Sequence, residues 1–323
     1  MEMANPTQAI NVSFSEYVRK RRIESNAHIE NGIPDYAYGL DYTLRQKINA
    51  IPGALKLCKS LLNTWIPAEK QRLNTHCLKV GPSQYPDIYE QAKYCAKMLG
   101  IGMPTVFIDP DINTINAYAF AADDNAPMIV LTSQLLERFS SGEVKTTIGH
   151  ECGHIHNNHS IYQVPAMLIF GMFDNDFFPG LRQLLALVTM PLRFTLNAWN
   201  RAAEITCDRA GIICADNLND AITSQAKFLY GGIMARNDVN IEEILKQYED
   251  IRKTPVRLLE LGDTHPLPVK RILAAKEFIN SEVLYGWRAD FKKNGMVLIN
   301  KQELDARCEK YINVLGNKQE GKK

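Results

Sequence analysis

The stretch TIGHECGHIHNNH, residues 147–159, constrains this chain more than any other part of it. It holds four of the chain's seven histidines, together with Gly149 and Gly153, in a segment of helical character. A glycine in a helix interior lowers helix stability by about 1 kcal/mol relative to alanine, so these two glycines need a structural reason. Residues four apart lie on one face of an α-helix, so His150 and His154 can reach the same metal ion. The segment therefore predicts a metal-binding helix.

The spacing also assigns a role to the acid between these two histidines. H-E-x-x-H is the motif of zinc peptidases, in which the glutamate, here Glu151, is a general base rather than a ligand. His156 and His159 fall about 240° and 180° away from His150 around the helix. We expect these two to be structural or surface histidines.

A hydrolytic zinc site needs a third protein ligand and leaves its fourth position to water. The extended motif H-E-x-x-H-x-x-G-x-x-H is excluded, because Asn157 and Ser160 occupy its glycine and last histidine positions. The segment NRAAEITCDRAG places Glu204 and Asp208 four apart on one helical face. We expect Glu204 to be the third ligand, and Asp208 to accept a hydrogen bond from a metal-bound histidine and so fix its ring.

Considered alone, these two acids are also typical of a solvated helix face on which Arg201 and Arg209 are their partners. The glycines of the motif helix argue for the metal site. Gly149 and Gly153 form a strip without side chains, which lets a second helix approach closely. We therefore expect the helix of the third ligand to pack on this strip through its own small residues, Ala203, Cys207 and Gly211.

Most of the chain has helical patterns. Helices are indicated for residues 10–30, for residues 42–62 with an interruption at Pro52, and for residues 86–100. Beyond Pro191 the pattern is helical to the end, with breaks at glycines and prolines. The sequence thus predicts an α+β fold that is mainly α-helical.

The strands are expected just before the motif helix. TVFIDP, INAYAFA and MIVLTS are short β-branched and aromatic runs, and ADDNAP joins the last two. They predict a small antiparallel sheet with a hairpin. Thr132 or Ser133 is expected to open a short helix, and Ser140 with Glu143 forms a capping-box signature at the start of the motif helix.

Four segments, in order, resemble the zinc metallopeptidases of the HtpX and CAAX prenyl protease type. They are INAYAF, TIGHECGHIHNNH, NRAAEITCDRAG and THPLPVKRI. The resemblance implies a zincin-like fold with a small antiparallel sheet beside the active-site helix. It covers residues 40–272, so we expect an N-terminal helical extension (1–39), a peptidase domain (40–280) and a C-terminal helical tail (281–323). One departure is Cys207, where the family usually has alanine.

This resemblance implies one Zn²⁺ per chain, held by the two motif histidines and Glu204, with Glu151 as the base. The resemblance also implies that His265 donates a hydrogen bond to the oxyanion of the tetrahedral intermediate, with Arg201 or Arg271 assisting. The strand residues that would pair with an extended peptide are Asn116, Ala117, Tyr118 and Ala119. Because backbone pairing selects for extended shape, we expect unfolded or flexible protein segments as substrates.

Composition bears on partners and location. A net charge of +1 argues against nucleic acid as a partner. The start of the chain has no pattern of a secretory signal, and seven scattered cysteines fit reduced thiols, so we expect a cytoplasmic protein. The apolar segment of residues 161–192 is interrupted by Asp174, Asp176 and Arg182, so neither half spans a bilayer. It is expected to form two buried helices, or else a peripheral membrane contact.

The sequence therefore predicts a zinc endopeptidase and does not fix its oligomeric state. Three alternatives remain open. The first is a catalytically silent fold that binds peptides or acts as a scaffold. The second is a membrane-peripheral protease of protein quality control. The third is a structural zinc site, which is the weakest because such sites prefer four protein ligands, often cysteine.

Overall fold

The computed structural model describes residues 28–30, 32–122, 125–174, 179–231, 239–252 and 260–312. Of these, the side chains of residues 30, 169–174, 179–193 and 250–252 are not described. The helix predicted for residues 10–30 lies outside the described residues as far as residue 27. Its last residues are a strand instead, β1 (Ile29–Glu30), which pairs with β2 (Ile33–Pro34) in a two-stranded sheet.

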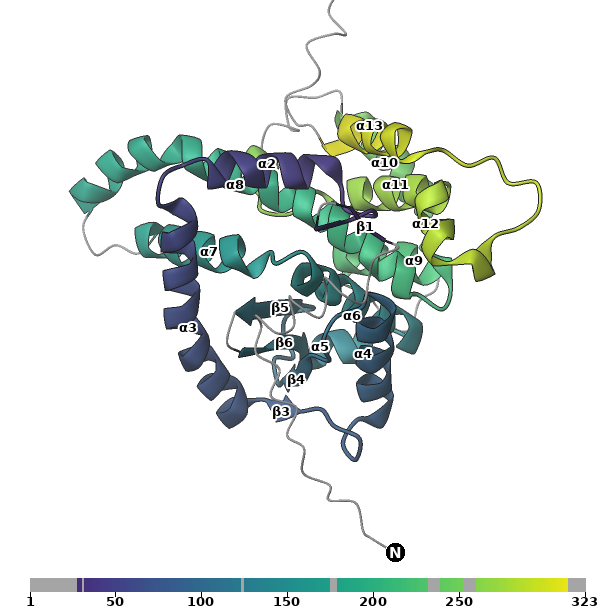
Figure 1. The fold of residues 1–323 in the computed structure, drawn as a ribbon, viewed down its shortest axis with the longest axis horizontal. Coiled ribbons are helices and arrows are strands. Elements are labelled where there is room, and N and C mark those ends of the chain that lie inside the picture. Colours follow the sequence, from purple (N-terminus) through teal and green to yellow (C-terminus); the bar gives the residue numbers. More distant parts are fainter. Residues whose placement is uncertain are drawn as a thin grey trace, which may run out of the picture.

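The larger sheet has four strands in the order β3-β4-β6-β5 (Figure 1). They are β3 (Leu78–Lys79), β4 (Thr105–Asp109), β5 (Ala117–Ala122) and β6 (Asn125–Thr132). The predicted hairpin is confirmed, since β5 and β6 pair antiparallel. The sheet is nevertheless mixed rather than wholly antiparallel, because the hairpin inserts β6 between β5 and β4, and β6 therefore runs parallel to β4.

The motif helix follows the sheet directly. Thr132 caps α5 (Ser133–Arg138), and Ser140 caps the motif helix α6 (Ser141–His156). The capping box is confirmed: the Ser140 hydroxyl accepts from the Glu143 N–H at 3.3 Å, and the Glu143 carboxylate accepts from the Ser140 N–H at 2.7 Å. Helix α4 (Pro86–Met98) packs against α6 as well.

The apolar segment after the motif forms α7 (Ser160–Asp174) and the long α8 (Pro179–Cys214). Of the described side chains at the start of α7, Tyr162, Val164 and Ala166 are buried. Within the described part of the chain, no helix combines the length and the apolar character that crossing a membrane requires.

Helices α6 and α8 pack closely at the glycine strip. A Cβ on Gly149 would lie 2.6 Å from the Cys214 Cβ, and one on Gly153 would lie 2.8 Å from the Ala210 Cβ. A Cβ on Gly211 would in turn lie 2.8 Å from a backbone oxygen of α6. The close approach is therefore confirmed, and any larger residue on the strip would push the helices apart. Of the three small residues predicted for α8, Ala203 packs elsewhere, with Trp199.

Helices surround this pair on the remaining sides. Before the sheet lie α2 (Gly39–Asn49) and α3 (Ala54–His76), which confirm the predicted interruption at Pro52. After α8 come α9 (Leu218–Tyr230), α10 (Ile241–Arg252), α11 (Pro268–Ile279), α12 (Glu282–Trp287), the 3₁₀ turn η2 (Ala289–Phe291) and α13 (Lys301–Ile312).

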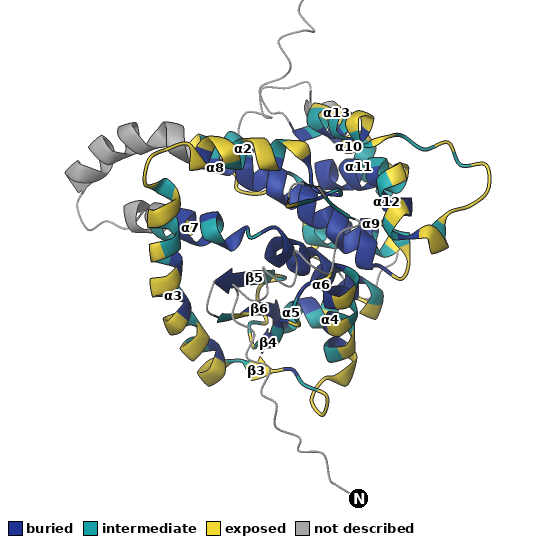
Figure 2. Ribbon diagram, in the orientation of Figure 1, coloured by how far each residue is buried: buried dark blue, intermediate teal, exposed yellow. Residues whose placement is uncertain are grey.

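The main core lies around α6 and the C-terminal half of α8, which are the most buried helices in Figure 2. Both flanks of the chain contribute to it: Tyr36 and Tyr38 from the N-terminal side, and Leu304 and Cys308 from α13. The division into an extension, a peptidase domain and a tail stays a prediction.

Candidate metal centre and active site

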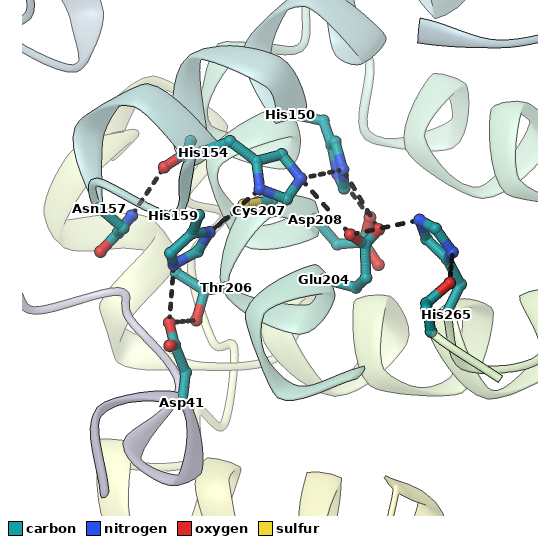
Figure 3. Close-up of polar contacts among 12 residues, drawn as sticks. Asp41, His150, His154, Asn157, His159, Glu204, Thr206, Cys207, Asp208 and His265 are labelled. Atoms are coloured by element: carbon teal, nitrogen blue, oxygen red, sulfur yellow. Dashed lines mark hydrogen bonds and ion pairs between the residues drawn. The ribbon is translucent and has the colours of Figure 1, made fainter. Parts of the chain in front are cut away.

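Three side chains from α6 and α8 converge on one point (Figure 3). The Nε2 atoms of His150 and His154 lie 3.2 Å apart, and each lies 3.4 Å from an oxygen of Glu204. Ligands of a tetrahedral zinc ion at about 2.0–2.1 Å stand about 3.3 Å from one another. The three donors therefore fit a single ion without rearrangement of the chain.

Cys207 is a second candidate for the third donor. Ligand atoms of His150, His154 and Cys207 all lie within 4.8 Å of one another. The Cys207 sulfur, however, contacts Nδ1 of His159 at 3.4 Å, on the side where His154 presents Nδ1 rather than Nε2. Burial raises the pKa of this thiol well above its usual value. Glu204 is thus the better third donor.

Asp208 holds the other nitrogen of His150. Its Oδ1 lies 3.0 Å from His150 Nδ1 and also accepts from the Gln225 amide at 3.0 Å. Arg271 of α11 donates to both Asp208 oxygens, at 2.8 and 2.5 Å, and its Nη1 lies 3.3 Å from Glu204. No sequence pattern had pointed to Gln225, which comes from α9.

Burial contradicts the alternative of a solvated acidic face. Glu204 and Asp208 are only 2% and 6% exposed. The proposed partner Arg201 instead donates to the carbonyls of Glu260 and Asp263, at 3.0 and 2.8 Å. Arg209 donates to the Tyr36 carbonyl at 3.0 Å, away from both acids. The two acids therefore belong to the interior of a site.

The charges around this site move several pKa values. Although burial opposes it, the carboxylates of Asp208 and Glu204 raise the pKa of His150 to about 10. Burial alone would raise the pKa of Glu204, but the charges of His265 and Arg271 hold this pKa well below its usual range. Burial raises the pKa of Glu151, against the opposing effect of both motif histidines. Glu151 is therefore a stronger base than an exposed glutamate.

His265 lies at the mouth of the site. Its Nε2 is 3.7 Å from a Glu204 oxygen, while its side chain is 64% exposed and its Nδ1 contacts the Thr264 hydroxyl at 2.9 Å. Arg201 of α8 donates to the carbonyls of Glu260 and Asp263, and these hydrogen bonds hold the loop before His265 against α8. The structure thus brings the predicted oxyanion donor to the predicted ligands.

A cleft of about 1220 Å³ opens over these residues. His150, Glu151, His154 and Glu204 line it, and so do all four residues of the predicted substrate strand. Its walls come from α3, β5, α7, α9 and the loop before α11. Site and strand therefore face one continuous space.

Strand β5 presents a free edge to this cleft, since it ends the sheet. The Asn116 N–H donates to the Thr132 hydroxyl, and the Asn116 C=O accepts from the Thr132 N–H, at 3.0 Å each, so both groups face β6. Residues of an antiparallel strand alternate between pointing both groups towards the partner and pointing both away. Ala117 and Ala119 therefore turn their backbone groups away from β6. The N–H of Ala121 is already used, because it donates to the Ser160 hydroxyl at 3.1 Å.

The two remaining motif histidines are buried. They are therefore structural histidines, and the alternative prediction of surface histidines is wrong. His156 Nδ1 contacts the Tyr36 hydroxyl at 2.7 Å. His159 lies between His154 and Asp41, 3.1 Å from each. Burial lowers the pKa of His159 to about 4, so its ring is neutral. The contact with His154 was not predicted.

Comparison with known proteins places this geometry in a family. Residues 82–279 match the sequence profile of Peptidase family M48, well over half of the chain. The plastoglobule-localized metallopeptidase 48 of Arabidopsis thaliana is 26% identical over 258 residues, covering 76% of this chain and 73% of its own. The Protease HtpX homolog of Thermoplasma volcanium is 27% identical over 221 residues, 60% of this chain and 71% of its own.

A shorter match is closer in sequence. Protease HtpX of Nitrosococcus oceani is 37% identical over 70 residues, 22% of this chain and 23% of its own. The residues matched by the family profile include both motif histidines, Glu204 and Arg271, which the fold brings together around one point. The chain therefore belongs to peptidase family M48 and is a metalloprotease of the HtpX type.

Proposed function

We propose that this metalloprotease is a zinc-dependent endopeptidase that cleaves unfolded or flexible protein segments. One observation carries the proposal: His150, His154 and Glu204 converge at the spacing of tetrahedral ligands, inside the same cleft as Glu151 and the free edge of β5. Nitrogen and carboxylate donors of this kind suit zinc, and a three-residue set leaves one position open, as in catalytic sites.

His150, His154 and Glu204 would hold the ion, with Asp208 keeping the His150 ring in place. Bound there, zinc would polarise the scissile carbonyl and acidify a water molecule. Glu151 accepts the proton of the attacking water and passes it to the leaving amine. His265, exposed at the mouth of the site, donates a hydrogen bond to the oxyanion.

The substrate lies along β5 as an added strand. Ala117 and Ala119 supply outward N–H and C=O groups, while the N–H of Ala121 is already bonded to Ser160. Beside this edge, Trp65, Tyr118, Val164 and Met167 form an apolar wall of the cleft that suits large apolar side chains. Backbone pairing requires an extended segment, which folded proteins rarely offer, so unfolded chains are preferred.

The test is cleavage of a fluorescently labelled unfolded polypeptide by zinc-loaded protein. We expect internal cleavage that stops in Glu151→Gln, with zinc retained. Zinc binding with no turnover of any unfolded substrate would support the silent peptide-binding alternative instead. The membrane-peripheral alternative predicts that the protein floats with liposomes, whereas we expect it to remain in the soluble fraction.

We also propose the cytoplasm as the location, with a role in protein quality control. The support for the location is chemical: all seven cysteines are free, and five are buried where an oxidant has little access. Cell fractionation with thiol labelling tests this, and recovery of the protein with oxidised cysteines in a secreted fraction would contradict it.

A further inference from the structure

A chain of two hydrogen bonds connects His154 to a carboxylate outside the cleft (Figure 3). The Nδ1 of His154 lies 3.1 Å from the Nδ1 of His159. The Nε2 of His159 lies 3.1 Å from an oxygen of Asp41. His159 and Asp41 are both 0% exposed, so no water competes for these bonds.

The end of α6 explains how His159 reaches this place. Asn157 caps the helix, and Asn158 has a φ of 56°, a left-handed conformation that asparagine tolerates better than most residues. The chain therefore turns back, and the His159 N–H donates to the His154 carbonyl at 3.0 Å. The two rings then lie 5.1 Å apart and nearly perpendicular, at 76°.

Hydrogen positions along this chain follow from the ligand role of His154. A histidine that coordinates through Nε2 keeps its hydrogen on Nδ1, and that N–H needs an acceptor. The acceptor is Nδ1 of His159, which must then carry its own hydrogen on Nε2. That N–H points at Asp41, which accepts it. Each bond thus dictates the direction of the next.

The Asp41 carboxylate, at which the hydrogen-bond chain ends, cannot rotate away. Asp41 accepts from Trp199 Nε1 at 2.9 Å and from the Thr206 hydroxyl at 2.8 Å, and Arg45 lies 3.2 Å from it. Asp41 belongs to α2, and Trp199 and Thr206 belong to α8. A fixed carboxylate fixes His159, and a fixed His159 leaves His154 a single orientation.

We propose that His159 and Asp41 are positioning residues for the metal ligand His154, because they hold its ring and its tautomer through the Asp41–His159–His154 hydrogen-bond chain. The proposal rests on the metal site proposed above. Both motif histidines are then hydrogen-bonded to a buried aspartate. His150 bonds to Asp208 directly, and His154 is connected to Asp41 through the His159 imidazole.

A purely structural role for the same residues is the competing account, since Asp41 ties α2 to α8. Two substitutions at one position separate the accounts. In His159→Asn the amide reaches about as far as Nδ1 and can still accept from His154. In His159→Gln it reaches about as far as Nε2, so it can still donate to Asp41 but leaves His154 without its acceptor. The matched control is His156→Asn, another buried histidine of the same helix end, which contacts Tyr36 instead.

The measurement is the zinc dissociation constant of each metal-free protein, by competition with a chelator. We expect wild type to bind zinc, His159→Gln to bind it about 10–100-fold more weakly, and His159→Asn to lie between them. The control should lose thermal stability and keep wild-type zinc affinity. Wild-type affinity in His159→Gln would overturn this inference alone, whereas a wild type that binds no zinc would overturn the proposed function.

A second measurement needs no variant and covers the case in which His159→Gln does not fold. Nitrogen-15 NMR of the zinc-loaded wild type reports which ring nitrogen of each histidine carries hydrogen. We expect His159 as the neutral Nε2–H form and His154 as the Nδ1–H form. Hydrogen on Nδ1 of His159 would overturn the inference.

Discussion

The two ends of the motif sequence use the same pairing for different purposes. His150 lies 3.0 Å from Asp208, and His159 lies 3.1 Å from Asp41, and all four side chains are buried. The first pair lines a cleft of about 1220 Å³, whereas the second is closed off at 0% exposure. A buried histidine–aspartate pair therefore does not by itself mark a catalytic site.

What separates the ends is the direction of the second ring nitrogen. In His150 it faces His154 and Glu204 in the cleft, and in His159 it faces the back of His154. Changes at the open end should alter turnover at constant stability, and changes at the closed end should first alter stability. Substitutions at the two ends can test this division.

Glu151→Gln should reduce kcat/KM for an unfolded substrate by about 10³-fold, because general-base catalysis contributes about 10²–10⁴-fold. Zinc content and the urea midpoint should not change, since Glu151 is not among the converging donors. Steady-state assays with metal analysis measure both. Glu90→Gln, at an exposed position of α4, is the control. Turnover in Glu151→Gln above a tenth of wild type would refute the open end as the catalytic one.

Asp41→Asn should lower the free energy of unfolding by about 3 kcal/mol, because it breaks a fully buried charged network. Asp35→Asn is a close control, since Asp35 also pairs with a histidine and a tryptophan, His28 at 2.9 Å and Trp287 at 2.6 Å, but is part-exposed. It should lose about 1 kcal/mol or less. Urea unfolding measures both, and equal losses would show that burial is not the deciding difference.

Gly153→Ala should destabilise the protein by about 1–3 kcal/mol, because the added Cβ meets Ala210 at 2.8 Å and the α6–α8 contact must open. The donors come from both helices, so zinc affinity should fall in parallel. Gly81→Ala, which has no atom within 4 Å of its added Cβ, should be neutral within about 0.5 kcal/mol. Unchanged zinc affinity in a destabilised Gly153→Ala would separate the helix contact from the metal site.

Ala119→Pro should reduce kcat/KM about 10-fold with little loss of stability. The N–H of Ala119 points away from β6, where proline is tolerated in an edge strand, but a substrate strand loses a donor. Tyr118→Pro removes an N–H that faces β6 and should instead destabilise the sheet. If Ala119→Pro cleaves the unfolded substrate at the wild-type rate, the substrate does not pair with β5.

The sequence predicted the parts of the site that lie on periodic helices. His150, His154, Glu204 and Asp208 repeat at helical spacing, and Gly149 with Gly153 predicted which helix would meet them. Each of these inferences needed only the geometry of a single helix. For the same reason, the hairpin and the capping box could be predicted from neighbouring residues.

The remainder depended on contacts between distant segments. Asp41 is 118 residues before His159, and Gln225 is 17 residues after Asp208, with no spacing rule to connect either pair. The sheet was expected to be antiparallel because local patterns do not show that β6 lies between β4 and β5. Strands of two residues, such as β3, carry too little pattern to be predicted.

The proposed site holds one zinc ion between α6 and α8 through His150, His154 and Glu204. Its most direct test is zinc per chain, by metal mass spectrometry, in wild type, Glu204→Gln and Cys207→Ser. We predict about one zinc in wild type and in Cys207→Ser, and far less in Glu204→Gln. Equal zinc in wild type and Glu204→Gln, with loss in Cys207→Ser, would contradict the claim and make Cys207 the third ligand.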